Sequence, residues 1–154
     1  ILTIQNLEKG AYLQFYDEVT FEDFSKSIEY ALGRLNTQDL DFWIADFRSI
    51  SSLALTLNDI KLLGHRDSVT SAYYISNLEY IFILDETFEI TYKNELKVYE
   101  EVVENSTNWN YNRFSNVEDC NYYLSSKSIP FKIPTLKQLV FKHFISLFLS
   151  PNLL

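Results

Sequence analysis

Two short apolar runs constrain the fold of this chain more than any other feature. Residues Phe42 to Phe47 and Leu78 to Leu84 are apolar almost throughout, and polar residues bound each run. Runs of this kind are typical of strands covered on both faces, as in a parallel sheet. A helical pattern separates the two runs, so the chain has to cross over between them. The sequence therefore predicts an α/β domain with right-handed crossovers.

Alternating and helical patterns fill the rest of the chain as far as Leu124. The segments 2–7 and 11–16 predict an N-terminal β-hairpin, with Gly10 expected to take a positive φ in its turn. The predicted order is β-β-α-β-α-β-α-β-α in a mostly parallel, mixed five-stranded sheet with crossover helices, plus an extra C-terminal helix. The remaining elements are expected as helices over 21–35, 57–63 and 88–103, a strand over 109–114 and a short helix over 117–124.

The second of these helices is expected to be short. Thr56 and Asp59 have the spacing of a helix cap. Gly64 is expected to close the helix at its C-terminus, because glycine favours the left-handed conformation that often follows a helix. His65 and Asp67 would then follow on the surface.

Charge is distributed unevenly along the chain. The net charge is -8, yet all acidic residues lie at or before Asp119, and only lysines, from Lys127 to Lys142, follow. The acidic body argues against a nucleic-acid interface, which needs clustered Lys and Arg. The single cysteine, Cys120, excludes an internal disulfide. No basic segment followed by an apolar stretch opens the chain, so we expect a cytoplasmic protein.

The C-terminal segment differs in composition from the rest. All three prolines lie at or beyond residue 130, and a helical stripe begins near Leu136 with Leu139, Val140, Phe144 and Leu147. About 14 residues are too few to cross a bilayer, which needs roughly 20. We expect this helix to pack on the uncovered sheet face or on a second copy, with a membrane surface as the less favoured alternative. The predicted division is a domain over 1–126 and a basic, apolar extension over 127–154.

Four hydroxyl groups are the candidate interaction or phosphoacceptor residues. Ser49, Ser51 and Ser52 are expected in a loop at the carboxyl end of the central strand, where open α/β sheets place ligands. A phosphate on Thr56 would meet the N-terminus of a helix, which favours negative charge. The simpler interpretation is that Thr56 caps the helix and the serines satisfy backbone groups in the loop.

Few patterns suggest chemistry. Asp46 and Asp85 end adjacent predicted strands and are candidate crevice carboxylates for an acid–base pair, although aspartate after a strand usually serves a turn or a cap. His65 has no nucleophile at a recognisable spacing, and Cys120 lies on the inner side of its helix. Metal-ligand spacings and a phosphate-binding glycine loop are absent. We expect no catalytic residues, no metal, no cofactor and no enzyme.

Three segments resemble the STAS domain, and most closely its SpoIIAA-like branch. They are the apolar strand ending in Asp over 42–48, the helix entry over 55–59, and the closing strand, turn and acidic helix start over 112–120. The resemblance covers about residues 2–126. It implies the fold of bacterial anti-sigma-factor antagonists and regulation by protein contact. In that family a Ser or Thr after the central strand is phosphorylated within an Asp-Ser-Ser-Gly type motif. This chain lacks the motif, and Thr56 or Ser52 lies nearest to that position.

Two functions follow as hypotheses. The first is a non-enzymatic regulatory or protein-interaction domain that binds a protein partner, or a second copy, through the loop after the central strand and the following helix. The second is a binding module for a small apolar or lipid-like ligand, which the resemblance to the SpoIIAA-like branch also implies.

Overall fold

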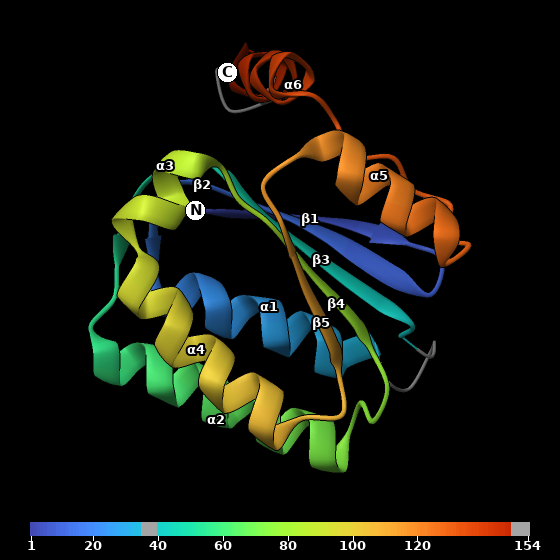
Figure 1. The fold of residues 1–154 in the computed structure, drawn as a ribbon. Helices are drawn as coiled ribbons and strands as arrows, with labels where there is room; N and C mark the ends of the chain where they lie inside the picture. Colours follow the sequence, from blue (N-terminus) through green and yellow to red (C-terminus); the bar gives the residue numbers. More distant parts are fainter. Residues whose placement is uncertain (35–39, 149–154) are drawn as a thin grey trace. The chain divides into compact units, whose positions relative to one another are not determined.

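The computed structural model describes residues 1–34 and 40–148 (Figure 1). The chain forms two compact units, Ile1–Asn116 and Val117–Leu154. The sequence predicted a boundary after residue 126. The second unit begins at Val117 and therefore also contains the short helix that follows the sheet. The elements in chain order are β1 (Leu2–Leu7), β2 (Gly10–Thr20), α1 (Phe21–Arg34), β3 (Phe42–Ala54), α2 (Leu57–Tyr73), β4 (Glu79–Ile83), α3 (Glu86–Thr91), α4 (Lys93–Ser106), β5 (Asn110–Phe114), α5 (Val117–Ser126) and α6 (Leu136–Phe148).

The first unit is built on one five-stranded sheet with the strand order β1-β2-β3-β4-β5. β1 pairs antiparallel with β2, and each later pair is parallel. The predicted α/β fold with an N-terminal hairpin and a mixed sheet is therefore confirmed. The expected conformation of Gly10 was wrong, because Lys9 takes the positive φ (58°) in the turn. Gly10 is needed instead for space, since a Cβ there would lie 2.4 Å from the Phe42 ring.

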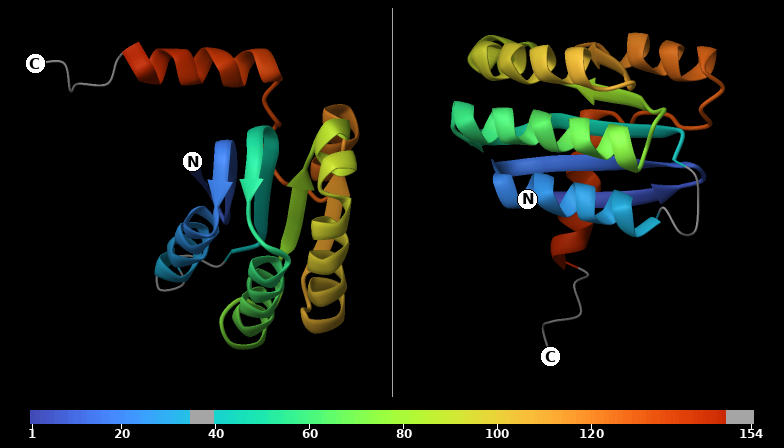
Figure 2. Two further views of the ribbon diagram at one scale, coloured as in Figure 1. Left: turned by 90° about the vertical axis from the view of Figure 1, so that its left-hand side faces the viewer. Right: turned by 90° about the horizontal axis from the view of Figure 1, so that it is seen from below.

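Helices α1, α2 and α4 cover one face of the sheet, and α2 lies between the other two (Figure 2). Alternate side chains of the strands point into this layer and form an aromatic core. The rings of Phe15 and Phe47 stack with centroids 4.7 Å apart, and Phe47 meets Phe82 edge-on at 5.1 Å. Aromatic contacts of this kind add to the free energy gained by burying the rings. These buried positions account for every second apolar residue of β4 and of the first half of β3.

Helix α2 continues for ten residues beyond its predicted end at residue 63. The predicted stop at Gly64 was therefore wrong. Gly64 lies in the middle of α2, where it faces α4. A Cβ at this position would lie 2.9 Å from the side chain of Val102. Glycine therefore allows two helices to approach closely, and its presence here reflects a contact with a residue far along the chain.

The predicted third helix is interrupted at Tyr92. Asp85 caps the start of α3, and the backbone of Tyr92 (φ -110°, ψ 30°) separates α3 from α4. The Tyr92 hydroxyl accepts a hydrogen bond of 2.9 Å from the Leu53 N–H at the end of β3. The break thus places a side chain where it satisfies a backbone group of the strand.

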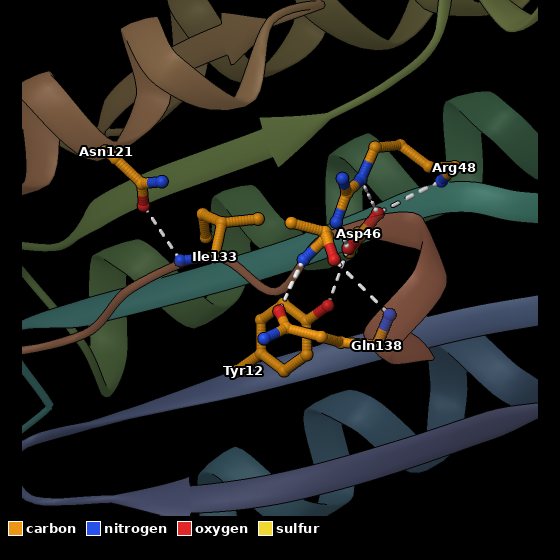
Figure 3. A network of polar contacts seen from close by, with 7 residues as sticks. Tyr12, Asp46, Arg48, Asn121, Ile133 and Gln138 are labelled. Atoms are coloured by element: carbon orange, nitrogen blue, oxygen red, sulfur yellow. Dashed lines mark hydrogen bonds and ion pairs between the residues drawn. The ribbon is translucent and has the colours of Figure 1, made fainter. Parts of the chain in front are cut away.

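The second unit contains α5, an extended connector and α6. The side-chain oxygen of Asn121 on α5 accepts a 2.8 Å hydrogen bond from the Ile133 N–H in the connector (Figure 3). Thr135 caps α6, since its hydroxyl accepts from the Gln138 N–H and its own N–H donates to Gln138 Oε1 at 2.9 Å. The predicted helix is confirmed, but the side chains of Phe144 and Leu147 from its expected stripe lie outside the described residues. Within residues 1–34 and 40–148, no helix has both the length and the apolar character needed to cross a membrane.

Candidate interaction site

The candidate serines lie inside a strand, so the expected loop was wrong. The second half of β3 pairs with the second half of β2, with Ser49 opposite Tyr16 and Ser52 opposite Glu18. The polar composition of this segment suggested a loop, but the backbone groups are held by strand pairing. Ser51 is exposed and the other two serines are half-buried. The connection from β3 to α2 is consequently only two residues long, ending at Thr56.

The pairing of β3 with β2 shifts its register directly after Asp46. The Asp46 carboxylate accepts hydrogen bonds from the Arg48 N–H (3.1 Å), Arg48 Nε (2.9 Å) and Arg48 Nη2 (2.7 Å). The Tyr12 hydroxyl on β2 donates a fourth, of 2.6 Å (Figure 3). Asp46 is fully buried, and the Arg48 side chain is only 5% exposed. Four donors, two of which form a bidentate ion pair, compensate for burying this carboxylate.

The electrostatics of this cluster fix its charges. Burial of Tyr12, the negative charge of Asp46 and the hydrogen bond to it all raise the pKa of the Tyr12 hydroxyl. Burial alone would lower the pKa of Arg48, but the hydrogen bonds and the charge of Asp46 outweigh it and raise that pKa. Tyr12 thus stays neutral and Arg48 stays charged over the physiological pH range. The cluster is suited to holding the two strands rather than to transferring protons.

Asp85, the second candidate carboxylate, has a different partner. Its Oδ1 accepts a 2.6 Å hydrogen bond from the Phe88 N–H and so caps α3. Asp46 and Asp85 are each engaged with donors of their own, and no described hydrogen bond joins them. The geometry gives no support to an acid–base pair.

Thr56 and Asp59 form a complete capping box at the start of α2. The Thr56 hydroxyl accepts from the Asp59 N–H at 3.2 Å, while the Asp59 carboxylate accepts from the Thr56 N–H at 2.8 Å and from the hydroxyl at 2.7 Å. The backbone hydrogen bond, and then the hydroxyl, lower the pKa of Asp59. A carboxylate already occupies the position that favours negative charge, so a phosphate on Thr56 would meet like charge there.

A buried polar cluster beneath α2 was missed from the sequence. Asp67 was expected on the surface, but its side chain is only 2% exposed and lies between α2 and α4. The Tyr99 hydroxyl donates a hydrogen bond to Asp67 Oδ2 and shares one of 3.1 Å with the Tyr80 hydroxyl on β4. Asp67 lies seven residues after Ile60, which is helical spacing, and this signal would have placed it on the inner face.

Burial dominates the electrostatics of Asp67. It raises the pKa of this carboxyl to about 6, against the opposing effects of the Arg66 charge and the hydrogen bond from Tyr99. Arg66 Nη2 lies 3.8 Å from Asp67 Oδ1, which makes an ion pair but no hydrogen bond. The carboxylate is therefore only partly compensated inside the helical layer.

The outward face of α2 carries an exposed apolar stripe, which consists of Leu62, Val69 and Tyr73. These side chains are 56%, 53% and 78% exposed. Their spacing of seven and four residues places them on one side of the helix. His65 and Lys61 beside them are also exposed. The helix that carries the stripe, α2, is the middle one of its layer (Figure 2).

One apolar cavity lies between the sheet and the helices. Its volume is about 40 Å³, and it is lined by Phe24, Phe47, Leu63, Phe82 and Phe88 with Glu95 as the one charged residue among them. A cavity that holds benzene has a volume of about 150 Å³. As it stands, this cavity is too small for a lipid or for an aromatic ring.

Two candidates remain, Cys120 and His65. Cys120 is buried and its thiol is not in a disulfide. His65 is exposed on α2. Across the described part of the chain, no three His, Cys, Asp or Glu side chains come close enough together to hold a metal ion.

Comparison with known proteins finds a likeness among solved structures. Neither a family model nor a curated protein matches the chain. Among solved structures, it is similar to the crystal structure of an uncharacterised protein from the DUF3478 family with a SpoIIAA-like fold, from Shewanella loihica PV-4. The two chains share 17% identity over 80% of this chain and 92% of the other, with a TM-score of 0.45. The description of that structure names the same fold as the resemblance stated from the sequence.

Proposed function

We propose that the protein is a non-enzymatic regulatory domain that binds a partner protein through the outward face of α2. The observation that carries this proposal is the stripe of Leu62, Val69 and Tyr73, each more than half exposed. Three apolar side chains aligned on one helix face are the arrangement by which a helix docks against another apolar surface. The candidate carboxylates Asp46 and Asp85 support the non-enzymatic part, because both are engaged in structural hydrogen bonds.

The charges beside the stripe define the chemistry of the partner. Beyond its capping Asp59, α2 exposes Lys61 and His65, while Arg66 is half-buried. A second copy docking through its own α2 would bring like charges together, which is unfavourable. The partner that fits is an apolar helix face flanked by acidic side chains. A different protein is therefore favoured over self-association through α2.

The segment from Ser49 to Thr56 leads directly into this surface. Ser51 and Thr56 are exposed, and Thr56 is held in the capping box at the start of α2. We place this segment at the edge of the interaction surface. We propose no phosphorylation switch for this segment, because the Asp59 carboxylate already lies at the start of α2, where a phosphate on Thr56 would have to lie.

The experiment is site-specific photo-crosslinking in the cells that produce the protein. A photo-reactive residue is placed at Leu62, and in parallel at Glu101 on α4, which is exposed but polar. We expect one discrete protein adduct from position 62 that disappears when Val69→Asp is added and persists when Ile90→Asp is added. Ile90 is 70% exposed on α3, so it supplies the same new charge away from α2. Equal adducts from both positions, or an adduct that survives Val69→Asp, would refute the proposal.

The second candidate is the binding of a small apolar ligand in the cavity between sheet and helices. Its apolar lining favours such a ligand, but about 40 Å³ accommodates only a group much smaller than benzene. A lipid would require α3 or α4 to move away from the sheet. We therefore rank ligand binding second. Native mass spectrometry of the protein purified from its own cells separates the two candidates, because a co-purifying lipid supports only the second.

A further inference from the structure

The C-terminal helix α6 carries a second exposed apolar group that the proposed function does not use. Leu136, Val140 and Phe141 are 49%, 68% and 64% exposed. Together with Lys137 they line one open hollow on the helix, and these four residues are called the α6 patch. Exposed apolar side chains grouped in this way mark a surface that another phase or molecule covers.

The charges of the C-terminal segment indicate what kind of surface the α6 patch binds. Every charged residue from Lys127 to the end of the chain is a lysine, and all 21 acidic residues of the protein lie at or before Asp119. Among the described residues, neither Lys132 in the connector nor Lys137 in the patch forms an ion pair. A second copy would bring the same lysines against each other. An anionic lipid surface offers negative charge and an apolar interior at the same contact.

From these observations we propose that the α6 patch docks on the surface of an anionic lipid bilayer. Val140 and Phe141 enter the boundary between headgroups and acyl chains. The stem of Lys137 runs along this apolar surface while its ammonium group reaches the lipid phosphates. Helix α6 has 13 residues and is too short to cross the bilayer, which needs roughly 20. It therefore lies in the plane of the interface.

The experiment uses the full chain and two kinds of vesicle, one of phosphatidylcholine and one of an equimolar mixture of phosphatidylcholine and phosphatidylglycerol. Co-sedimentation measures binding at low and high salt. We expect binding to the mixed vesicles only, and weaker binding at high salt because salt screens the lysines. Lys137→Glu should reduce the partition coefficient at least fivefold, since one lysine near an anionic surface contributes about that factor. Phe141→Asp should reduce it by a larger factor.

Ile90→Asp is the matched control, because it adds the same charge to an exposed apolar residue of α3. It should bind mixed vesicles like the unaltered protein. A Phe141→Trp variant gives an independent readout, and its fluorescence should shift to shorter wavelength with mixed vesicles alone.

Absence of binding to mixed vesicles at low salt would overturn the proposal. Binding that Phe141→Asp leaves unchanged would overturn it as well, because the contact would then lie elsewhere. Concentration-dependent dimerisation that Phe141→Asp abolishes, without vesicle binding, would assign the α6 patch to a second copy instead.

Discussion

The hydroxyl of Tyr99 donates a hydrogen bond to the buried carboxylate of Asp67 and thereby ties α4 to α2. The Tyr80 hydroxyl on β4 continues the cluster. Asp67 Oδ1 and Arg66 Nε are buried and lack a hydrogen-bond partner. Polar groups left in this state lower the stability of a folded protein. Helix α2, which carries the proposed interaction surface, is thus held against α4 by the Asp67 carboxylate. The hydrogen bonds of this carboxylate offset only part of the cost of burying it.

Stability should fall as pH rises through the range in which Asp67 titrates. The pKa of this carboxyl is about 6 in the folded protein, above its ordinary value of 3.8, because of burial. Between these values the folded state holds a proton that the unfolded state has released. The contribution of Asp67 to the free energy of unfolding should therefore decrease by about 3 kcal/mol from below pH 4 to above pH 6.

The variant Asp67→Asn tests this contribution. An amide does not ionise and can still accept from the Tyr99 hydroxyl, so the variant should lack this decrease and be more stable at neutral pH. Urea unfolding at pH 4.5 and pH 7.5 measures the difference, with Asp59→Asn as a control for an exposed aspartate. The same pH dependence in Asp67→Asn and in the unaltered protein would exclude Asp67 as its source.

The two glycines Gly64 and Gly33 should respond in opposite ways to alanine. Gly64→Ala places a Cβ 2.9 Å from Val102, and overpacking of this kind typically costs about 1–3 kcal/mol. At Gly33 no heavy atom lies within 4 Å of the new Cβ, so alanine should stabilise helix α1, by up to about 1 kcal/mol. Thermal unfolding measures both. Adding Val102→Ala should restore part of the loss in Gly64→Ala, and a Gly64→Ala variant as stable as Gly33→Ala would contradict the close contact.

Removing the charge of Asp46 should destabilise the protein strongly. Asp46→Asn leaves the buried Arg48 guanidinium facing an uncharged amide, and breaking a buried ion pair in this way costs about 3–5 kcal/mol. Asp85→Ala is the comparison, because it removes only a helix cap and should cost about 1 kcal/mol. Denaturant unfolding of both variants checks the ranking. Equal losses would mean that the ion pair between Asp46 and Arg48 adds no more stability than a helix cap.

Thr56 should act as a cap. Thr56→Ala removes a hydroxyl that both accepts from and donates to Asp59, and the loss should be about 1 kcal/mol. Ser51→Ala, at an exposed strand position, should have little effect. Thr56→Glu should be less stable than Thr56→Ala, since its carboxylate meets that of Asp59. If Thr56→Glu proved the more stable of the two, a phosphate at this position would again be a plausible signal.

The fold could be predicted because its signals are local. The apolar runs that form β3 and β4 and the cap at Thr56 depend on residues a few positions apart. The errors arose where distant residues decide. The polar segment after Phe47 resembles a loop, and only its pairing with the end of β2 makes it a strand.

The candidate site shows the same limit. Gly64 resembles a helix stop until Val102 is placed beside it. If the helix ends at Gly64, Asp67 is expected on the surface. Its hydrogen bond with Tyr99, 32 residues away, then cannot be predicted. The apolar stripe on α2 was hidden for the same reason, because Val69 and Tyr73 belong to α2 only when the helix continues past Gly64.

The affinity of the partner captured at Leu62 tests the central claim most directly. Isothermal titration of that purified protein into the unaltered chain, Val69→Asp and Ile90→Asp compares two exposed apolar positions that receive the same charge. The account predicts that Val69→Asp weakens binding at least tenfold, that Ile90→Asp binds like the unaltered chain, and that both variants unfold at the same temperature. Equal affinity of Val69→Asp and the unaltered chain would contradict a function that depends on the outward face of α2.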